Sequence, residues 1–165
     1  MDTQKESLAY PDGVLDASVI VPACFENPLK ANSIEFLSEV MLQKRRVALP
    51  ILAVMGAYHI ATRYLRVSKI DVKKVMEGIL RSGSPALYPY IAPEIATDCL
   101  DYATAYDIES WDGYIISLAR SLGSTIIYSL DEELSNVKEV TVVNPFPQDK
   151  VKQYRGFLER IIHER

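Results

Sequence analysis

The fold is decided by the stretch Val14-Leu15-Asp16-Ala17-Ser18-Val19-Ile20-Val21, which is a short and nearly continuous apolar run. Runs of this kind are typical of strands that are buried on both faces of a parallel sheet. Asp16 interrupts the run, and an ionised carboxylate in such a strand is costly unless it is paired or bound to a cation. We expect Asp16 near the carboxyl end of the strand, where doubly wound sheets bind ligands.

Helical and strand-like segments alternate along the rest of the chain. The apolar spacing predicts helices over Leu29–Gln43, Ile51–Leu65, Asp71–Arg81, Pro93–Tyr106 and 110–122, and strands over Val47–Leu49, Ala86–Ile91, Thr125–Tyr128 and Val140–Val143. Ser110 is expected to cap its helix, which Gly123 ends. The alternation predicts an α/β fold, a three-layer α/β/α sandwich around a central parallel sheet.

Turn residues near the end of the chain set the domain boundaries. We expect one domain over residues 13–143, followed by a linker at Asn144-Pro145-Phe146-Pro147. The amphipathic pattern from Asp149 to His163 predicts a final helix, within residues 148–164, that packs on the domain or extends from it.

Composition narrows the class of protein. The chain has 165 residues, 48% hydrophobic residues and a formal net charge of −4, which argues against a basic protein that coats nucleic acid non-specifically. Cys24 and Cys99 form no CxxC motif and are expected to be reduced thiols, which indicates a cytoplasmic location. The polar start, Met1–Pro11, does not resemble a signal peptide, and the longest apolar run, Val47–Ala61, is too short to span a membrane.

Three aspartates are candidates for chemistry, and each also has a structural explanation. Backbone amides at the strand end would satisfy Asp16. Asp112 falls in the first turn of its helix, where acids favour the helix dipole. Asp131 follows a strand, and the capping-box spacing of Ser129 and Glu132 makes it an ordinary first-turn acid. If the three converge, their mutual repulsion calls for a cation, and oxygen ligands favour Mg²⁺ or Mn²⁺.

Three short motifs carry a resemblance to a known family. Val14-Leu15-Asp16-Ala17-Ser18 resembles the first-strand motif of PIN domains, and Trp111-Asp112-Gly113-Tyr114-Ile115 begins a stretch similar to their second motif. Ile126-Ile127-Tyr128-Ser129-Leu130-Asp131 is similar to the third, in which Ser or Thr precedes an aspartate by two positions. Order and spacing agree over roughly residues 13–143.

The resemblance implies a site and an activity. Asp16, Asp112 and Asp131 would be metal ligands and catalytic residues, with Ser18 and Ser129 supporting them. The implied reaction is hydrolysis of RNA phosphodiesters with Mg²⁺ or Mn²⁺. Many family members with this short layout are VapC-type toxins, which implies RNA as substrate and an antitoxin-like protein as partner.

One expected acid is missing from the family pattern. PIN nucleases usually carry a glutamate on the helix after the second strand, and counting from Pro50 places Gly56 there. Close packing of this helix against the sheet explains a glycine as well as loss of activity does. His59, expected to be partly buried, and Glu35 and Glu132 are possible substitutes. A PIN domain that binds RNA or a protein without cleavage is therefore the alternative function.

Substrate binding would use positive charge and aromatic rings. The available cations are Lys44-Arg45-Arg46, Arg63, Arg66, Lys69 and Lys73-Lys74, and such runs are more often solvated faces. Trp111, Tyr88, Tyr90 and Tyr114 could stack on bases, although core packing accounts for most of them. The helices at Ile51–Leu65 and near the C-terminus each offer an apolar face, so we expect a homodimer.

Overall fold

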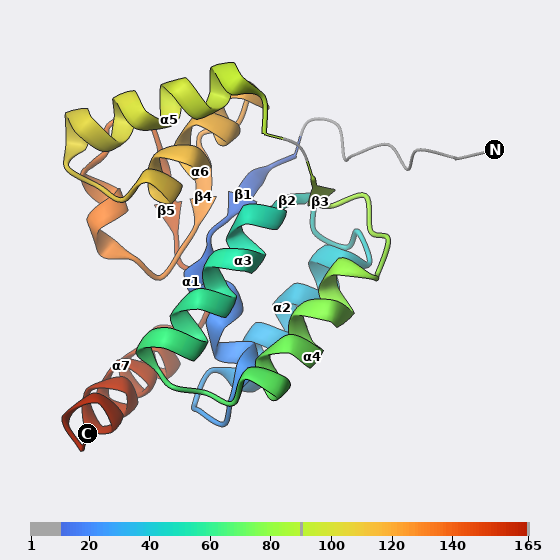
Figure 1. Cartoon of the computed structure of the whole chain (residues 1–165), viewed down its shortest axis with the longest axis vertical. Helices are drawn as coiled ribbons and strands as arrows, with labels where there is room; N and C mark the ends of the chain where they lie inside the picture. The colour runs from blue at the N-terminus through green and yellow to red at the C-terminus, as the bar shows by residue number, and fades with distance from the viewer. Residues whose placement is uncertain (1–10, 90, 165) are drawn as a thin grey trace.

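The computed structural model describes residues 11–89 and 91–164, and Figure 1 shows its elements. Most of the polar lead-in predicted over Met1–Pro11, and Tyr90, lie outside the described residues. Five strands form one sheet in the order β3-β2-β1-β4-β5, and every neighbouring pair is parallel. The strands are β1 (Gly13–Leu15), β2 (Val47–Pro50), β3 (Leu87–Tyr88), β4 (Ile126–Tyr128) and β5 (Thr141–Val143).

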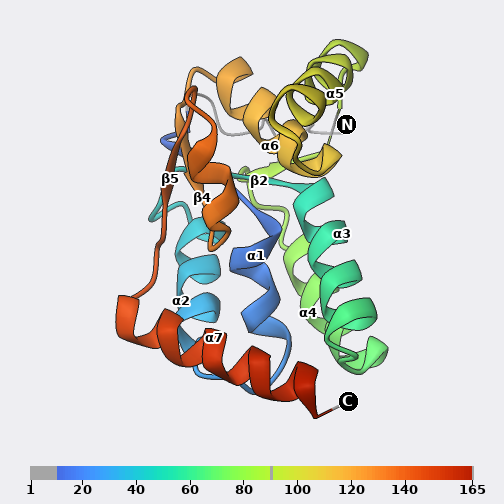
Figure 2. The same ribbon diagram turned by 90° about the vertical axis from the view of Figure 1, so that its left-hand side faces the viewer.

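Seven α-helices surround this sheet in the described residues. They are α1 (Ala17–Ile20), α2 (Lys30–Met41), α3 (Ile51–His59), α4 (Lys69–Leu80), α5 (Pro93–Tyr106), α6 (Ser110–Ser121) and α7 (Gln148–His163). Figures 1 and 2 show α5 and α6 at one end of the molecule and α2, α4 and α7 at the other, with the sheet between them. The predicted α/β/α sandwich with a central parallel sheet is confirmed.

The first strand is shorter than predicted. We expected strand conformation across 14–21, but β1 ends at Leu15 and Asp16 caps α1 by accepting a hydrogen bond from the Ser18 backbone N–H at 3.3 Å. A 3₁₀ turn, η1 (Val21–Cys24), follows. The apolar residues Val19, Ile20 and Val21 are buried because α2 and α3 pack on this segment, and Ser33 Oγ donates to the Val19 carbonyl at 2.6 Å. The buried apolar residues of this segment therefore gave the sequence pattern of a buried strand, although the segment is helical.

Most other predicted elements are present with shifted ends. α5 begins and ends as predicted, and β3 is a two-residue strand close to Pro89. The prediction that Ser110 caps its helix was wrong, because Ser110 is the first residue of α6 and Glu109 holds the cap position without a side-chain bond. α3 continues into a π-helical turn, η2 (Ile60–Tyr64).

The C-terminal helix packs against the start of the chain. Val151 and Tyr154 of α7 are buried, and the Phe25 ring lies 6.5 Å from that of Tyr154 and 6.2 Å from that of Phe157, between ring centroids. In the described part of the chain, no helix is both long and apolar enough to cross a membrane.

Candidate functional site

The sheet brings two of the three aspartates to one edge. Leu15 of β1 pairs with Tyr128 of β4, and the strands are parallel, so their carboxyl ends coincide. Asp16 directly follows β1, and Asp131 follows β4 as the cap of a 3₁₀ turn, η3 (Glu132–Asn136). Asp112 lies in the first turn of α6, which packs on both strands. All three side chains line one pocket of about 170 Å³.

Two serines hold the Asp16 carboxylate in place. Ser18 Oγ and Ser129 Oγ donate hydrogen bonds to Asp16 Oδ2 at 2.6 and 2.8 Å. The same hydroxyls accept from the backbone, since the N–H of Leu130 bonds Ser18 Oγ and that of Asp131 bonds Ser129 Oγ, both at 2.9 Å. Ser129 thus ties Asp16 to the turn that carries Asp131, and its hydroxyl forms these bonds rather than the capping box with Glu132 that was the alternative explanation for Asp131.

Asp112 has an unusual electrostatic environment. Its pKa is raised from 3.8 to about 7, first by burial and then by the negative charges of Asp16, Asp131, Glu109 and Glu133. Repulsion of this kind arises when several carboxylates share a poorly solvated space. A cation in the pocket would relieve it, which is the behaviour expected of a metal-binding group of acids.

The pocket offers carboxylate oxygens, which are the donor type that suits a hard divalent ion. In the described part of the chain, however, no group of three or more His, Cys, Asp or Glu side chains has an arrangement that could hold a metal ion. Mg²⁺ is commonly held by one or two carboxylates, with water and substrate oxygens completing its shell. Asp16 Oδ2 accepts both serine bonds, so coordination through Asp16 would use mainly Oδ1.

Gly56 occupies the wall of this pocket, on α3. A Cβ added there would lie 3.5 Å from the Cβ of Ala17, which is ordinary contact. The explanation that tight packing against the sheet requires glycine was therefore wrong, because the neighbour is α1 and a methyl group fits. Gly56 lines the same pocket as the three aspartates, which is where the resemblance to PIN domains places the usual glutamate, but it offers no side-chain ligand.

The suggested substitutes for the missing acid are not in the pocket lining. His59 is exposed rather than partly buried, and its ring contacts the rings of Tyr64 and Trp111. Glu132 is exposed and pairs with Arg155 at 2.8 Å, and Glu35 is exposed on α2. None of these three side chains therefore replaces the acid that is missing at Gly56.

Sequence reasoning missed Glu109, which lines the pocket. It precedes Asp112 by three residues at the end of the loop between α5 and α6, so the two belong to adjacent turns. Its negative charge is among the causes of the raised pKa of Asp112, as is that of Glu133. An acid shortly before a helical aspartate was the available signal.

The basic clusters differ in whether their charges are paired with acidic side chains. Arg45 pairs with Glu39 and lies over the Phe36 ring, and Lys73 pairs with Glu77 at 3.3 Å. The described residues provide no ion-pair partner for Arg63, Arg66 and Lys69, which are all exposed. This second group follows α3, whose residues line the acidic pocket.

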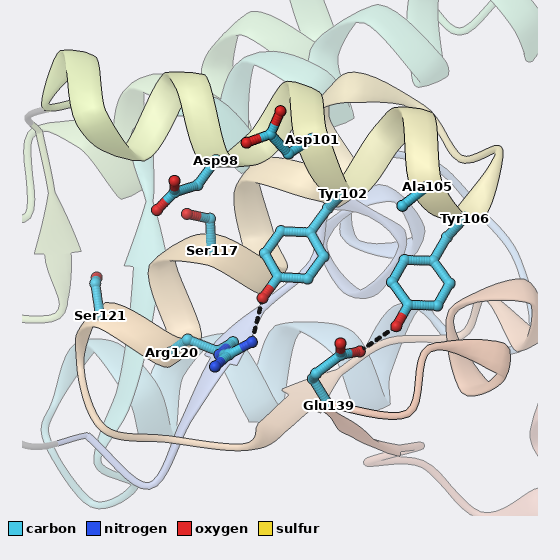
Figure 3. Close-up of a pocket in the computed structure, with 9 residues that line it drawn as sticks. All are labelled: Asp98, Asp101, Tyr102, Ala105, Tyr106, Ser117, Arg120, Ser121 and Glu139. Atoms are coloured by element: carbon cyan, nitrogen blue, oxygen red, sulfur yellow. Dashed lines mark hydrogen bonds between the residues drawn. The ribbon is translucent and has the colours of Figure 1, made fainter.

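A more open pocket of about 560 Å³ lies between α5 and α6 (Figure 3). Its polar groups largely satisfy one another: Arg120 donates to the Tyr102 hydroxyl, and the Tyr106 hydroxyl donates to Glu139. Its lining shares no residue with the aspartate pocket. We therefore regard it as a structural junction.

Comparison with known proteins gives one family match. A family model described as PIN domain matches residues 13–140, which include the three aspartates and end before β5 and α7. No curated protein gives a significant match to the chain.

Proposed function

Because this chain belongs to the PIN domain family, we propose that it is a metal-dependent endoribonuclease that hydrolyses RNA phosphodiesters at the aspartate pocket. One observation carries the proposal. Three carboxylates from segments that are distant in the sequence line one pocket, and their charges contribute to raising the pKa of Asp112 to about 7. Carboxylates with strongly perturbed pKa values cluster at functional sites, and a bound cation would offset their repulsion.

The residues take distinct roles in this proposal. Asp16, Asp112 and Asp131 hold Mg²⁺ or Mn²⁺, and Ser18 and Ser129 fix the orientation of Asp16 through Oδ2. The ion, when bound, supplies Lewis-acid activation of the phosphodiester and of a water molecule. Asp112, protonated over much of the range below pH 7 in the free protein, releases its proton as the ion binds.

Glu109 is the residue that we propose in place of the usual helix glutamate. It lines the same pocket as Gly56, but it approaches from α6 rather than from α3. The alternative function, binding of RNA or a protein without cleavage, is favoured by Gly56 itself, because the family's usual acid is absent there. Cleavage that depends on Glu109 would decide between the two.

The test is an RNA cleavage assay with a labelled single-stranded oligoribonucleotide, titrated with Mn²⁺ and Mg²⁺. We expect metal-dependent cleavage that falls at least about 100-fold in Asp16→Asn, as is usual when a transition-state-stabilising group is removed. Glu109→Gln is expected to weaken metal dependence, whereas Glu35→Gln, an exposed acid on α2, serves as the matched control. Cleavage that persists unchanged in Asp16→Asn would refute the site.

Family membership supports further proposals about location and partners. We propose a cytoplasmic, VapC-type toxin with an antitoxin-like partner, and a homodimer. The two cysteines are free and buried, in agreement with a reducing compartment.

The dimer interface that we propose lies between α2 and α4. α3 and α7 turn most of their apolar residues inward, whereas exposed Ile34 and Leu42 border an apolar groove between α2 and α4, which suits a second copy of the chain better than α3 or α7 does. Light scattering of Leu42→Asp, compared with Ile162→Asp on α7, tests this interface.

A further inference from the structure

Three aromatic rings lie close together, and one of them lines the acidic pocket. Trp111 lines the pocket and is 40% exposed, and the His59 ring lies 6.1 Å from it and 5.5 Å from the ring of Tyr64, between centroids. We call these three side chains the aromatic platform. Resting on the proposed ribonuclease function, we propose that the platform stacks a base of single-stranded RNA beside the phosphate to be cleaved, and so selects unpaired substrate.

The backbone provides a specific device for assembling this platform. Residues five apart on an α-helix point in different directions, whereas the i→i+5 bonding of a π turn places them on a common side. The turn η2 follows His59 and ends at Tyr64, and the two rings are in edge contact. Without the π turn, Tyr64 would not meet His59, so the local irregularity of α3 gathers the rings.

Exposure separates the platform from core aromatics. Tyr114 follows Trp111 on the same helix but is only 2% exposed, whereas Tyr64 is 64% exposed. Large aromatic side chains kept partly in water beside a pocket are the usual means of stacking unpaired bases. Bases in a duplex already stack on each other, so this platform requires an unpaired nucleotide.

The charges around the platform agree with a nucleic acid as its occupant. Arg63, Arg66 and Lys69 flank Tyr64 in the sequence, are exposed and have no ion-pair partner among the described residues. Side chains of this kind neutralise phosphates. A strand with one base stacked beside Tyr64 would carry its neighbouring phosphates next to the segment that holds these cations.

The platform can be observed directly, because Trp111 is the only tryptophan of the chain. We would titrate the Asp16→Asn variant, which should not cleave, with a single-stranded oligoadenylate and follow tryptophan fluorescence. We expect saturable quenching by the single strand, and much less quenching by a duplex of the same length or by an abasic oligonucleotide. Equal signals from the single strand and the abasic oligonucleotide, or no signal, would overturn the proposal.

Variants in the same background supply the second arm, read by anisotropy of labelled RNA. Trp111→Ala is expected to weaken binding by roughly ten-fold, which is within the range of one base–aromatic stack, and Trp111→Phe to restore most of it. Leu100→Ala, an exposed apolar residue on α5, is the matched control and should leave binding unchanged. Equal binding by Trp111→Ala and the control would refute stacking.

The two proposals fail in distinguishable ways. Stacking without cleavage by the unmodified protein in Mn²⁺ or Mg²⁺ would support the platform and favour the non-cleaving alternative. Metal-dependent cleavage with unaltered KM in Trp111→Ala, and without quenching, would support the nuclease and refute the platform.

Discussion

Asp112 makes the stability of the protein depend on pH. Its pKa is about 7 in the folded chain and near 3.8 when unfolded, so the folded state binds more protons between these values. The favourable contribution of protonated Asp112 to the free energy of unfolding is therefore fully present below pH 4, and it is lost as the pH rises to about 7. Without metal, Asp112→Asn should therefore raise the free energy of unfolding at pH 8 by about 1–2 kcal/mol, after allowance for solvent screening, and have little effect at pH 4.

Denaturant unfolding at both pH values measures this difference. Asp101→Asn, which removes an exposed carboxylate of α5 outside the aspartate pocket, is the matched control. Adding Mn²⁺ should stabilise the unmodified protein more at pH 8 than at pH 5, because the ion binds the charged carboxylate. Equal effects of Asp112→Asn at pH 4 and pH 8 would contradict this account.

Two substitutions at Gly56 separate the effect of packing from the effect of metal binding. Gly56→Ala should stabilise the protein by about 0.5–1 kcal/mol, because helix propensity improves and the Cβ is accommodated 3.5 Å from Ala17. Gly56→Glu adds a carboxylate at the pocket and should tighten Mn²⁺ binding by roughly ten-fold while destabilising the metal-free protein. Calorimetric titration with Mn²⁺ measures the affinity of both variants. Equal affinities of the Glu and Ala variants would show that a side chain at position 56 does not reach the ion.

The sequence identified Asp16 on physical grounds, since a carboxylate in an apolar run needs a partner. It identified Asp112 and Asp131 only through motif order, because each is also a normal helix-start acid. The acid three residues before Asp112 was the available signal for Glu109, whereas the contact of Trp111 with His59 could not be predicted, because it depends on how the folded chain orients the two side chains.

At the scale of the element, Gly113 sets the distance between α5 and α6. A Cβ at this position would lie 2.2 Å from the Cys99 carbonyl oxygen, so any larger residue forces the helices apart. Gly113→Ala is expected to lower the free energy of unfolding by about 1–3 kcal/mol, as overpacking does, and to weaken metal binding by displacing the adjacent Asp112. Thermal unfolding and Mn²⁺ titration check both effects.

Gly156→Ala is the matched control for that substitution. Gly156 lies within α7, and an added Cβ meets nothing within 4 Å, so alanine should stabilise by about 0.5–1 kcal/mol. Similar effects of the two substitutions would show that the α5–α6 contact tolerates a side chain.

The elements were predictable in type and order but less so at their ends. Helix spacing located α5 to the residue because Pro93 opens it, whereas the run after Asp16 gave no sign of changing from strand to helix. The apolar residues Val19, Ile20 and Val21 of that run are buried, as in a strand, and the change to helix is marked locally by hydrogen bonds between Asp16 and Ser18, two residues apart.

At the scale of the whole molecule, the net charge would make the proposed RNA binding depend on a few cations. The chain carries a formal charge of −4, so Arg63, Arg66 and Lys69 must offset a general repulsion. With three phosphates neutralised, the logarithm of the binding constant should fall with the logarithm of the KCl concentration with a slope of about −2 at constant Mn²⁺. Arg66→Ala should reduce the slope by about 0.7, whereas Lys73→Ala, whose charge is paired with Glu77, should not.

The pairing of β1 with β4 also decides when during protein synthesis the site can exist. Asp16 receives its hydrogen bond from Ser129, 113 residues later in the chain. During synthesis Asp16 is made well before Asp112, Ser129 and Asp131, so for that time its carboxylate lacks the hydrogen bond from Ser129. A polypeptide whose synthesis has not yet reached Asp131 therefore carries no assembled aspartate pocket, and any activity of this pocket begins only after β4 has been made and has paired with β1.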